Sequence, residues 1–203
     1  MDRFQFFKNS TDRAAEKRES QFCPLCGYGL TRKGNGSHPS QVCGSCGHIL
    51  HLNPSPGVTV IIENEKGEVL IGKRASGIDY AGFWCLPGGY IEYEESFLEA
   101  ALRETKEETG LIIELKGIIN IVSNMLDENH HTLVVVLLGK PAGGKLKPGD
   151  DMCGLSWINR EEHSQVKYAF EADKRIIDCY FTGTLERIPI DKRFNKSQDL
   201  CCF

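Results

Sequence analysis

The segment GYIEYEESFLEAALRETKEETGL, residues 89–111, carries the strongest structural signal in this chain. On a helix, Glu104, Glu107 and Glu108 share one face, because they are spaced i, i+3 and i+4. Like charges within one turn repel each other and weaken the helix, so we expect something positive to neutralise them. Carboxylate oxygens suit Mg²⁺ or Mn²⁺, ions that usually reach proteins together with substrate phosphates. By composition alone, a solvated helix face would be the simpler interpretation.

The arginine and glycine positions around these glutamates favour the metal site, because the segment resembles the Nudix box, the signature of the Nudix hydrolases. The signature is Gly, five residues, Glu, seven residues, Arg-Glu, an apolar residue, any residue, Glu-Glu, any residue, Gly and an apolar residue. Thr105 stands where an aliphatic residue is usual, and Glu94 stands where many relatives have Gly. Neither departure removes a ligand. The matching positions are Gly89, Glu95, Arg103, Glu104, Glu107, Glu108, Gly110 and Leu111.

The resemblance implies hydrolysis of a nucleoside diphosphate linked to another group, with Mg²⁺ or Mn²⁺ as cofactor. It implies that Glu104 and Glu108 are the main metal ligands, and that Glu107 is a further ligand or a base. Arg103 would orient the glutamates by hydrogen bonds, with a surface ion pair as the alternative. Glu95 would support the helix start or bind metal through water, and an interaction with the helix dipole explains it nearly as well.

Several candidates lie before the box. Gly88 and Gly89 would offer backbone groups close to the metal, where a Cβ would interfere. Arg74 ends a predicted strand and is a candidate phosphate ligand, or a plain surface residue. The base of a nucleotide could stack on aromatic residues of the same region, although Trp84 fits the core better. These aromatic candidates are Tyr80, Phe83 and Trp84.

Two loops after the box add weaker candidates. Residues of the first loop could supply a distal catalytic base, or could simply be turn-forming residues. The candidates are Asp127, Glu128, His130 and His131. Asp150 and Asp151 stand where many relatives carry an acidic pair. Gly154 stands where those relatives often have Glu, so a further metal ligand from this second loop is doubtful.

Length and charge narrow the class of protein. A chain of 203 residues suits one ordinary domain with a small appendage, and 40% hydrophobic residues support a packed core. The charge of 24 − 28 = −4 argues against nucleic-acid binding. The longest apolar run, residues 133–138, is a buried strand rather than a membrane span. Residues 1–22 lack the apolar centre of a signal peptide, so we predict a cytoplasmic protein with no membrane contact.

The cysteines indicate a zinc ribbon rather than disulfides. Their total is nine, an odd number in a chain without a signal peptide. Two Cys-x-x-Cys pairs, Cys23 with Cys26 and Cys43 with Cys46, have the spacing of a structural four-cysteine Zn²⁺ site. A redox pair, or a ribbon that has lost its metal, remains the alternative.

The predicted ribbon is close to neutral. Residues 21–53 contain Arg32 and Lys33 but no Asp or Glu, and four thiolates with Zn²⁺ contribute about −2. This is a weak electrostatic footprint for phosphate backbones. We therefore expect the ribbon to serve stability, dimerisation or substrate enclosure.

The order of elements resembles the α+β Nudix fold, a mixed sheet sandwiched between helices. The segment 53–57, with two prolines, reads as a linker, and we expect residues 58–62 and 68–74 to form a hairpin. Ser96 is a plausible N-cap and Gly110 a C-cap. Further strands are expected at 111–124, 131–139 and 155–158, and a helix at 161–182. The predicted organisation is a flexible N-terminus (1–20), a zinc ribbon (21–53), a Nudix domain (57–182) and a C-terminal tail (183–203) that is loose from Pro189.

A zinc ribbon before a Nudix domain resembles the NADH pyrophosphatases and a set of FAD or ADP-ribose pyrophosphatases. The NADH enzymes carry Ser-Gln-Pro-Trp shortly after the box, and residues 111–132 contain nothing similar. ADP-ribose or another ADP-containing dinucleotide such as FAD therefore fits better. Oxidised nucleoside triphosphates, as in house-cleaning pyrophosphatases, stay open. A nucleotide sensor and a ribbon-based interaction protein are the non-enzymatic alternatives, but sensors tend to lose ligand glutamates and all are present here.

Overall fold

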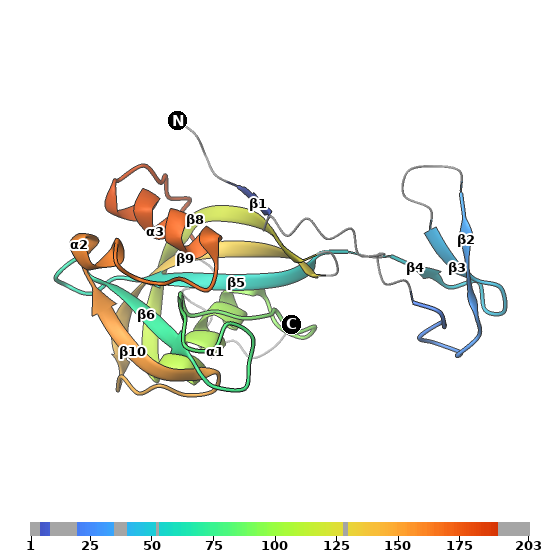
Figure 1. The fold of residues 1–203 in the computed structure, drawn as a ribbon, viewed down its shortest axis with the longest axis horizontal. Helices are drawn as coiled ribbons and strands as arrows, with labels where there is room; N and C mark the ends of the chain where they lie inside the picture. The colour runs from blue at the N-terminus through green and yellow to red at the C-terminus, as the bar shows by residue number, and fades with distance from the viewer. Residues whose placement is uncertain (1–4, 9–19, 35–39, 52, 128–129, 191–203) are drawn as a thin grey trace.

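The computed structural model describes residues 5–8, 20–34, 40–51, 53–127 and 130–190 (Figure 1). Its helices are α1 (Phe97–Thr109), α2 (Arg160–His163) and α3 (Glu171–Phe181). Among the described residues, none of these helices is long and apolar enough to cross a membrane. The strands are β1 (Phe6–Lys8), β2 (Leu30–Lys33), β3 (Ser40–Cys43), β4 (Ile49–Leu50), β5 (Ser55–Ile62), β6 (Val69–Arg74), β7 (Trp84–Cys85), β8 (Leu111–Asp127), β9 (His130–Gly144) and β10 (Met152–Ile158).

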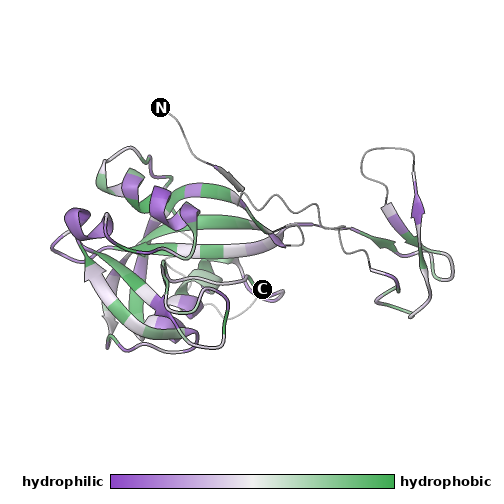
Figure 2. Cartoon of the chain, viewed as in Figure 1, coloured by the Kyte–Doolittle hydropathy of each residue, from purple (hydrophilic) through white to green (hydrophobic). Residues whose placement is uncertain are grey.

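The predicted sandwich of a mixed sheet between helices is confirmed. A four-stranded sheet has the order β1-β8-β9-β5, with β8 and β9 antiparallel and the two outer pairs parallel. Strand β5 is buried on both faces, as expected for a strand covered on two sides. Val58, Val60 and Ile62 pack with α1, whereas Ile61 packs with α3 on the other side. Figure 2 shows hydrophobic residues concentrated on the strands and hydrophilic ones on the outer faces of α2 and α3.

The prediction that residues 58–62 and 68–74 pair as a hairpin is wrong, because the two strands belong to different sheets. Its turn forms, since the Asn64 amide donates to the Glu68 carbonyl, but beyond one bridge between Glu63 and Val69 the strands diverge. Strand β6 joins a separate antiparallel sheet of order β10-β6-β7. The predicted linker is also partly wrong, because β5 begins at Ser55 and Pro56 pairs with Leu133. This strand is parallel to β9, so its partner lies far along the chain, beyond the reach of a local pattern.

The helix expected at 161–182 is two helices. Residues between α2 and α3 run along β7: the Trp84 amide donates to the Lys167 carbonyl at 2.9 Å, and the Ala169 amide donates to the Trp84 carbonyl at 2.8 Å. These backbone groups of Lys167 and Ala169 bond to Trp84 and are not available for hydrogen bonds within a helix. The helix is therefore interrupted at this point. Trp84 is half-buried against the core, as its expected core role requires.

Described residues of both terminal segments contact the body of the molecule. Within the N-terminus, β1 pairs in parallel with β8 through residues 123–125. Within the C-terminal segment, Ile188 exchanges two backbone hydrogen bonds of 2.8 Å with Ile118. Leu185 and Ile190 pack against the hydrophobic core on either side of that bridge. The remaining sheet, β2-β3-β4, belongs to the cysteine-rich segment and lies apart from the body in Figure 1.

Helix α1 is fixed at both ends by its own sequence. Ser96 is the N-cap and forms a reciprocal capping box with Glu99, which satisfies backbone amides that the helix leaves open. Gly110 ends the helix with φ 71, a left-handed conformation that glycine adopts without a Cβ penalty. A Cβ there would also overlap the Lys145 carbonyl. The helix therefore cannot slide along its sequence, and its glutamates face fixed directions.

Two threonines one turn apart in α1 are fully buried but differ in their hydrogen bonds. The Thr109 hydroxyl donates to the Thr105 carbonyl and accepts from the Leu111 amide. The Thr105 hydroxyl has no hydrogen-bond partner among the described residues. The unusual threonine of the box thus packs its methyl group, as expected, and leaves a buried hydroxyl unsatisfied.

We therefore predict that Thr105→Val raises the free energy of unfolding by about 1 kcal/mol, because it removes an unsatisfied buried hydroxyl without changing shape. Thr109→Val is the matched control and should lower it by a similar amount, because the Leu111 amide loses its acceptor. Urea denaturation of both variants measures the difference. If both variants were destabilised equally, the Thr105 hydroxyl would have a partner.

Candidate active site and zinc site

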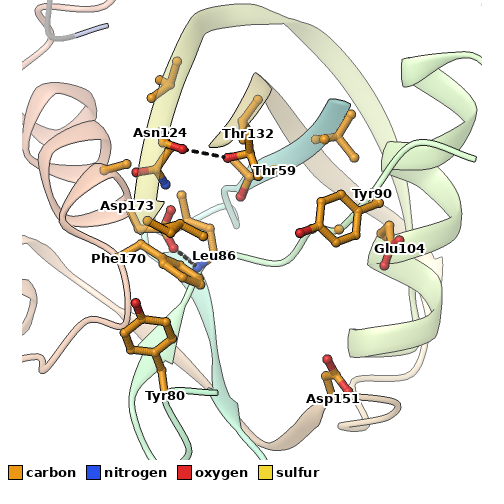
Figure 3. A pocket seen from close by; sticks show the side chains of 18 of the residues that line it. Thr59, Tyr80, Leu86, Tyr90, Glu104, Asn124, Thr132, Asp151, Phe170 and Asp173 are labelled. Atoms are coloured by element: carbon orange, nitrogen blue, oxygen red, sulfur yellow. Dashed lines mark hydrogen bonds between the residues drawn. The ribbon is translucent and has the colours of Figure 1, made fainter. Parts of the chain in front are cut away.

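A cavity of about 690 Å³ lies between α1, the strands of the four-stranded sheet and α3 (Figure 3). Acidic side chains line one side of it: Glu104 and Glu108 from α1, and Asp150 and Asp151 from the loop before β10. Helix α3 contributes residues to the other side. The volume is in the range of cavities that hold small molecules.

Glu108 is the most buried acid of the group, with 3% of its surface exposed. Burial, followed by the nearby charges of Glu104, Asp151 and Asp150, raises the pKa of its carboxyl group to about 8. The Gly88 amide opposes this effect by donating to Glu108 Oε2 at 2.8 Å. The pKa of Glu104 is raised as well, mainly by burial. Such a cluster of buried like charges favours binding of a cation.

Arg103 is the positive partner that the box sequence leads us to expect. Its guanidinium donates to both oxygens of Glu95, to Glu104 Oε1 at 2.8 Å and to Glu107 Oε2 at 3.1 Å. It also donates to the Tyr90 carbonyl at 3.1 Å, which ties α1 to the loop before it. Hydrogen bonding to Arg103 lowers the pKa of Glu95. Arg103 thus forms hydrogen bonds to three acids of the box, Glu95, Glu104 and Glu107.

The structure brings together only two of the three glutamates expected to bind metal. The side chain of Glu107 is 49% exposed, faces Arg103 and does not line the cavity. Among the described residues, the one group whose possible ligand atoms already lie within 4.8 Å of each other is the set of four cysteines. A cation at the acids would therefore have to draw their oxygens together.

Gly88 and Gly89 stand beside the acids at positions where a side chain would not fit. A Cβ on Gly89 would overlap the Glu104 carboxylate. Gly88 has φ 154, and a Cβ there would overlap the Val58 carbonyl. Both glycines line the cavity next to the carboxylates. This corner combines carboxylate oxygens with two glycines that have no side chain. Such an oxygen-rich, acidic site suits Mg²⁺ or Mn²⁺.

The acidic loop is attached to the end of α1. The Gly149 amide donates to the Glu108 carbonyl at 3.0 Å, and the Lys147 amide donates to the Thr109 carbonyl at 2.9 Å. The Asp151 carbonyl accepts from the Ala75 amide at 2.8 Å. These bonds place Asp150 and Asp151 beside Glu108, despite the missing glutamate at Gly154. Asp150 and Asp151 therefore line the same cavity as Glu104 and Glu108.

Arg74 and Tyr80 line the cavity around an aromatic residue of the opposite wall. The Tyr80 ring meets the Phe170 ring edge-on, with centroids 5.3 Å apart, and the Arg74 guanidinium lies 5.6 Å from the Phe170 centroid. Arg74 Nε also donates to the Asp79 carbonyl at 2.8 Å. Phe83 and Trp84, the other aromatic candidates, do not line the cavity.

Of the candidate bases in the loop after β8, His130 reaches the cavity. Its Nε2 lies 2.6 Å from the Tyr90 hydroxyl, at a position where Tyr90 also lines the wall. His131 does not line the cavity, and its Nε2 is buried without a hydrogen-bond partner among the described residues. Glu128 and the side chain of Asp127 lie outside the described residues.

The sequence analysis missed Asn124, Thr132, Phe170 and Asp173, which all line the cavity. Asp173 is 7% exposed, accepts from the Leu86 amide at 2.9 Å, and burial raises its pKa to about 7. A signal for it existed: Asp173 falls on the apolar stripe formed by Phe170, Ile176 and Ile177. A carboxylate on such a stripe must be buried with a partner or a function.

The four cysteines of the predicted zinc ribbon converge. Cys26 Sγ lies 3.5 Å from Cys43 Sγ and 3.5 Å from Cys46 Sγ, and Cys23 Sγ lies 3.7 Å from Cys46 Sγ. Each pair turns at a glycine with positive φ, Gly27 or Gly47. Backbone hydrogen bonds, first from Cys46 and then from Ser45, lower the pKa of Cys43 to about 6. Four thiol groups around one point match the tetrahedral ligand set of Zn²⁺.

The family model and the crystal structure that match this chain name the same family. A sequence model described as NUDIX domain matches residues 53–179. The chain is 35% identical over 130 residues to an ADP-ribose pyrophosphatase of Methanocaldococcus jannaschii, covering 64% of this chain and 75% of that protein. It is 34% identical over 106 residues to a putative 8-oxo-dGTP diphosphatase of Bacillus subtilis, covering 51% and 65%. A crystal structure of a NUDIX hydrolase from Nitrosomonas europaea superposes with a TM-score of 0.70 at 25% identity, covering 80% of this chain and 91% of that one.

The buried acid predicts a pH effect on stability. The pKa of Glu108 rises from 4.5 to about 8 on folding, so the folded state binds its proton more tightly. Its stabilising contribution is complete below about pH 4.5 and is lost as the pH rises to about 8. Glu108→Gln keeps an acceptor for the Gly88 amide and removes this loss. In magnesium-free buffer at pH 8.5 we expect it to stabilise the protein by roughly 2–4 kcal/mol, and to have little effect at pH 4.5.

Urea denaturation at the two pH values measures this effect, with Glu94→Gln, an exposed acid of the same segment, as the control. Mg²⁺ should raise the stability of the wild type and of the control but not that of Glu108→Gln. Equal pH profiles for all three proteins would contradict the position of Glu108 in the buried cluster.

We further predict that the purified protein carries one zinc ion per chain. Native mass spectrometry measures the ion directly, and Cys43→Ser should abolish it because a buried ligand is lost. Cys153→Ser is the control, since Cys153 is exposed and distant in sequence from the cluster. A folded chain that carries no zinc after purification in reducing buffer without chelator would refute the zinc site.

Proposed function

Because the chain belongs to the NUDIX family of hydrolases, we propose that it is a divalent-metal-dependent pyrophosphohydrolase acting on ADP-ribose or another ADP-containing dinucleotide. The observation that carries the proposal is the meeting of Glu104, Glu108 and the Gly88–Gly89 corner in one cavity. Asp150 and Asp151 add to the same negative corner.

In this proposal Glu104 and Glu108 hold Mg²⁺ or Mn²⁺, with Glu107 moving in as a further ligand or as the base. The ion supplies charge screening for the diphosphate and a lowered pKa for an attacking water. Arg103 keeps Glu95 and Glu104 in place through its hydrogen bonds. The Gly88 amide fixes Glu108. Arg74, on the other side of the cavity, is available to a phosphate.

Hydrolysis breaks one phosphoanhydride bond with one water. From ADP-ribose the products are AMP and ribose 5-phosphate. The anionic diphosphate repels hydroxide, so the rate depends on positive charge and on the exclusion of bulk water. His130 and Tyr90, hydrogen-bonded to each other at the cavity wall, are candidates for moving a proton at the attacking water.

Three arguments support an ADP-containing substrate. The relative from Methanocaldococcus jannaschii is named an ADP-ribose pyrophosphatase, and the chain covers most of it. The Ser-Gln-Pro-Trp stretch of NADH pyrophosphatases is absent. The cavity also has an aromatic wall for a base. A house-cleaning activity on oxidised nucleoside triphosphates is the second candidate, favoured by the relative named a putative 8-oxo-dGTP diphosphatase.

The zinc ribbon, residues 21–53, is proposed to stabilise the chain or to take part in a homodimer, rather than to bind nucleic acid. A cytoplasmic location and a homodimer remain predictions from the sequence.

The decisive experiment is a product assay with Mg²⁺ over ADP-ribose, FAD, NADH, diadenosine polyphosphates and 8-oxo-dGTP. We expect ADP-ribose to have the highest kcat/KM, and Glu108→Gln to reduce kcat at least about 100-fold because a metal ligand is lost. Circular dichroism verifies that the variant is folded, and Glu94→Gln serves as the control. Full activity of Glu108→Gln would refute the metal site. A higher kcat/KM for 8-oxo-dGTP would instead favour the second candidate.

A further inference from the structure

From the wall opposite the acids we infer that Asn124 and Asp173 together recognise the base of the substrate and select adenine. The inference rests on the proposed function, because it concerns the same cavity and its nucleotide. Both side chains line that cavity. Figure 3 shows them on the side formed by β8 and α3, across from Glu104 on α1. A nucleotide with its phosphates at Glu104 and Glu108 therefore has its base available to this wall.

Both groups are buried, yet each keeps hydrogen-bonding capacity that the protein does not use. Asn124 is 9% exposed and Asp173 is 7% exposed. Asp173 Oδ2 accepts from the Leu86 amide, and in the described part of the chain Oδ1 has no donor. The backbone carbonyl of Asn124 accepts from the Thr132 hydroxyl, while its side-chain amide bonds to none of the described residues. Buried polar groups usually have partners, so both groups indicate a ligand.

The hydrogen-bonding types of the two groups match adenine. An ionised carboxylate can only accept, so Asp173 Oδ1 suits the 6-amino group, which donates. The Asn124 amide offers an N–H to the neighbouring ring nitrogen N1, which accepts. Hypoxanthine differs from adenine at these positions alone. It presents a carbonyl oxygen and an N1–H, so its oxygen would face the Asp173 carboxylate.

The surroundings suit the flat face of a purine. Phe170 lies one turn before Asp173, and its ring lines the same cavity. Leu86, Val122 and Ile176 add apolar surface around it. A base held between these groups would stack on an aromatic ring while its edge meets Asn124 and Asp173. An aromatic ring stacks on any base, so stacking does not distinguish adenine from other bases. Asn124 and Asp173 would therefore determine which base is bound.

Asp173→Asn tests the inference because it reverses one hydrogen bond and keeps the shape. The new amide can still accept from the Leu86 amide with its oxygen, which turns its N–H₂ group toward the base. Asn124 can rotate its own amide to accept from N1–H. Calorimetry at pH 8.5, above the raised pKa of Asp173, measures the binding of AMP and IMP.

We expect wild-type protein to bind AMP at least about tenfold more tightly than IMP, since a charged hydrogen bond is exchanged for a repulsion. Asp173→Asn should remove or reverse this preference. Glu171→Gln, on the exposed side of α3, is the matched control and should keep it. Asn124→Ala provides a second variant should Asp173→Asn not fold, and should weaken the binding of AMP because N1 of the base loses its donor.

Equal affinity of the wild type for AMP and IMP, or tighter binding of GMP than of AMP, would overturn the base assignment. Hydrolysis of ADP-ribose and of its inosine counterpart, measured in parallel, separates the two proposals. An AMP preference that depends on Asp173, in a protein that hydrolyses neither compound, overturns the proposed function and supports the recognition of adenine. Hydrolysis of both compounds with equal kcat/KM overturns the recognition alone.

Discussion

The ion pairs of Arg103 are the interaction on which the site depends. Glu104, Glu107 and Glu108 lie within one turn of α1, and their mutual repulsion would weaken a helix that had no compensating charge. Arg103 bonds to Glu95, Glu104 and Glu107 with one guanidinium and reaches the Tyr90 carbonyl as well. It therefore joins the helix to the loop before it while it neutralises the acids. Glu108, which Arg103 does not contact, is the acid whose pKa rises most, and it is the one left to a cation.

The position of Glu108 follows from close packing around α1. The helix begins at a capping box and ends at a glycine, so its register is fixed by local sequence. The acidic loop is then attached to the helix end by bonds from Gly149 and Lys147. The glycine pair 88–89 approaches the carboxylates from the other side. The loop and Gly88 make their contacts with backbone atoms, whereas the capping box uses the side chains of Ser96 and Glu99. This explains how several separate segments meet at one place.

The errors of the sequence interpretation have a common physical cause. Local patterns predicted β5 and β6 as hairpin partners, but β5 pairs in parallel with β9, whose residues lie far along the chain. The apolar spacing at 161–182 predicted one helix, but the backbone around Lys167 and Ala169 is used by Trp84. In both cases a non-local partner competes with the local preference and prevails.

The sequence by itself determined helix α1, its caps, the family and the cysteine cluster. These features depend on residues close together in the chain, where spacing fixes geometry. Only the tertiary structure decided which carboxylates share a cavity, and that Asn124 and Asp173 complete its far wall. Those residues come from β8 and α3, and nothing in their neighbours shows that a sheet and a helix will bring them together. Hydrogen bonds and packing between distant segments set that arrangement, and they exist only once the chain has folded.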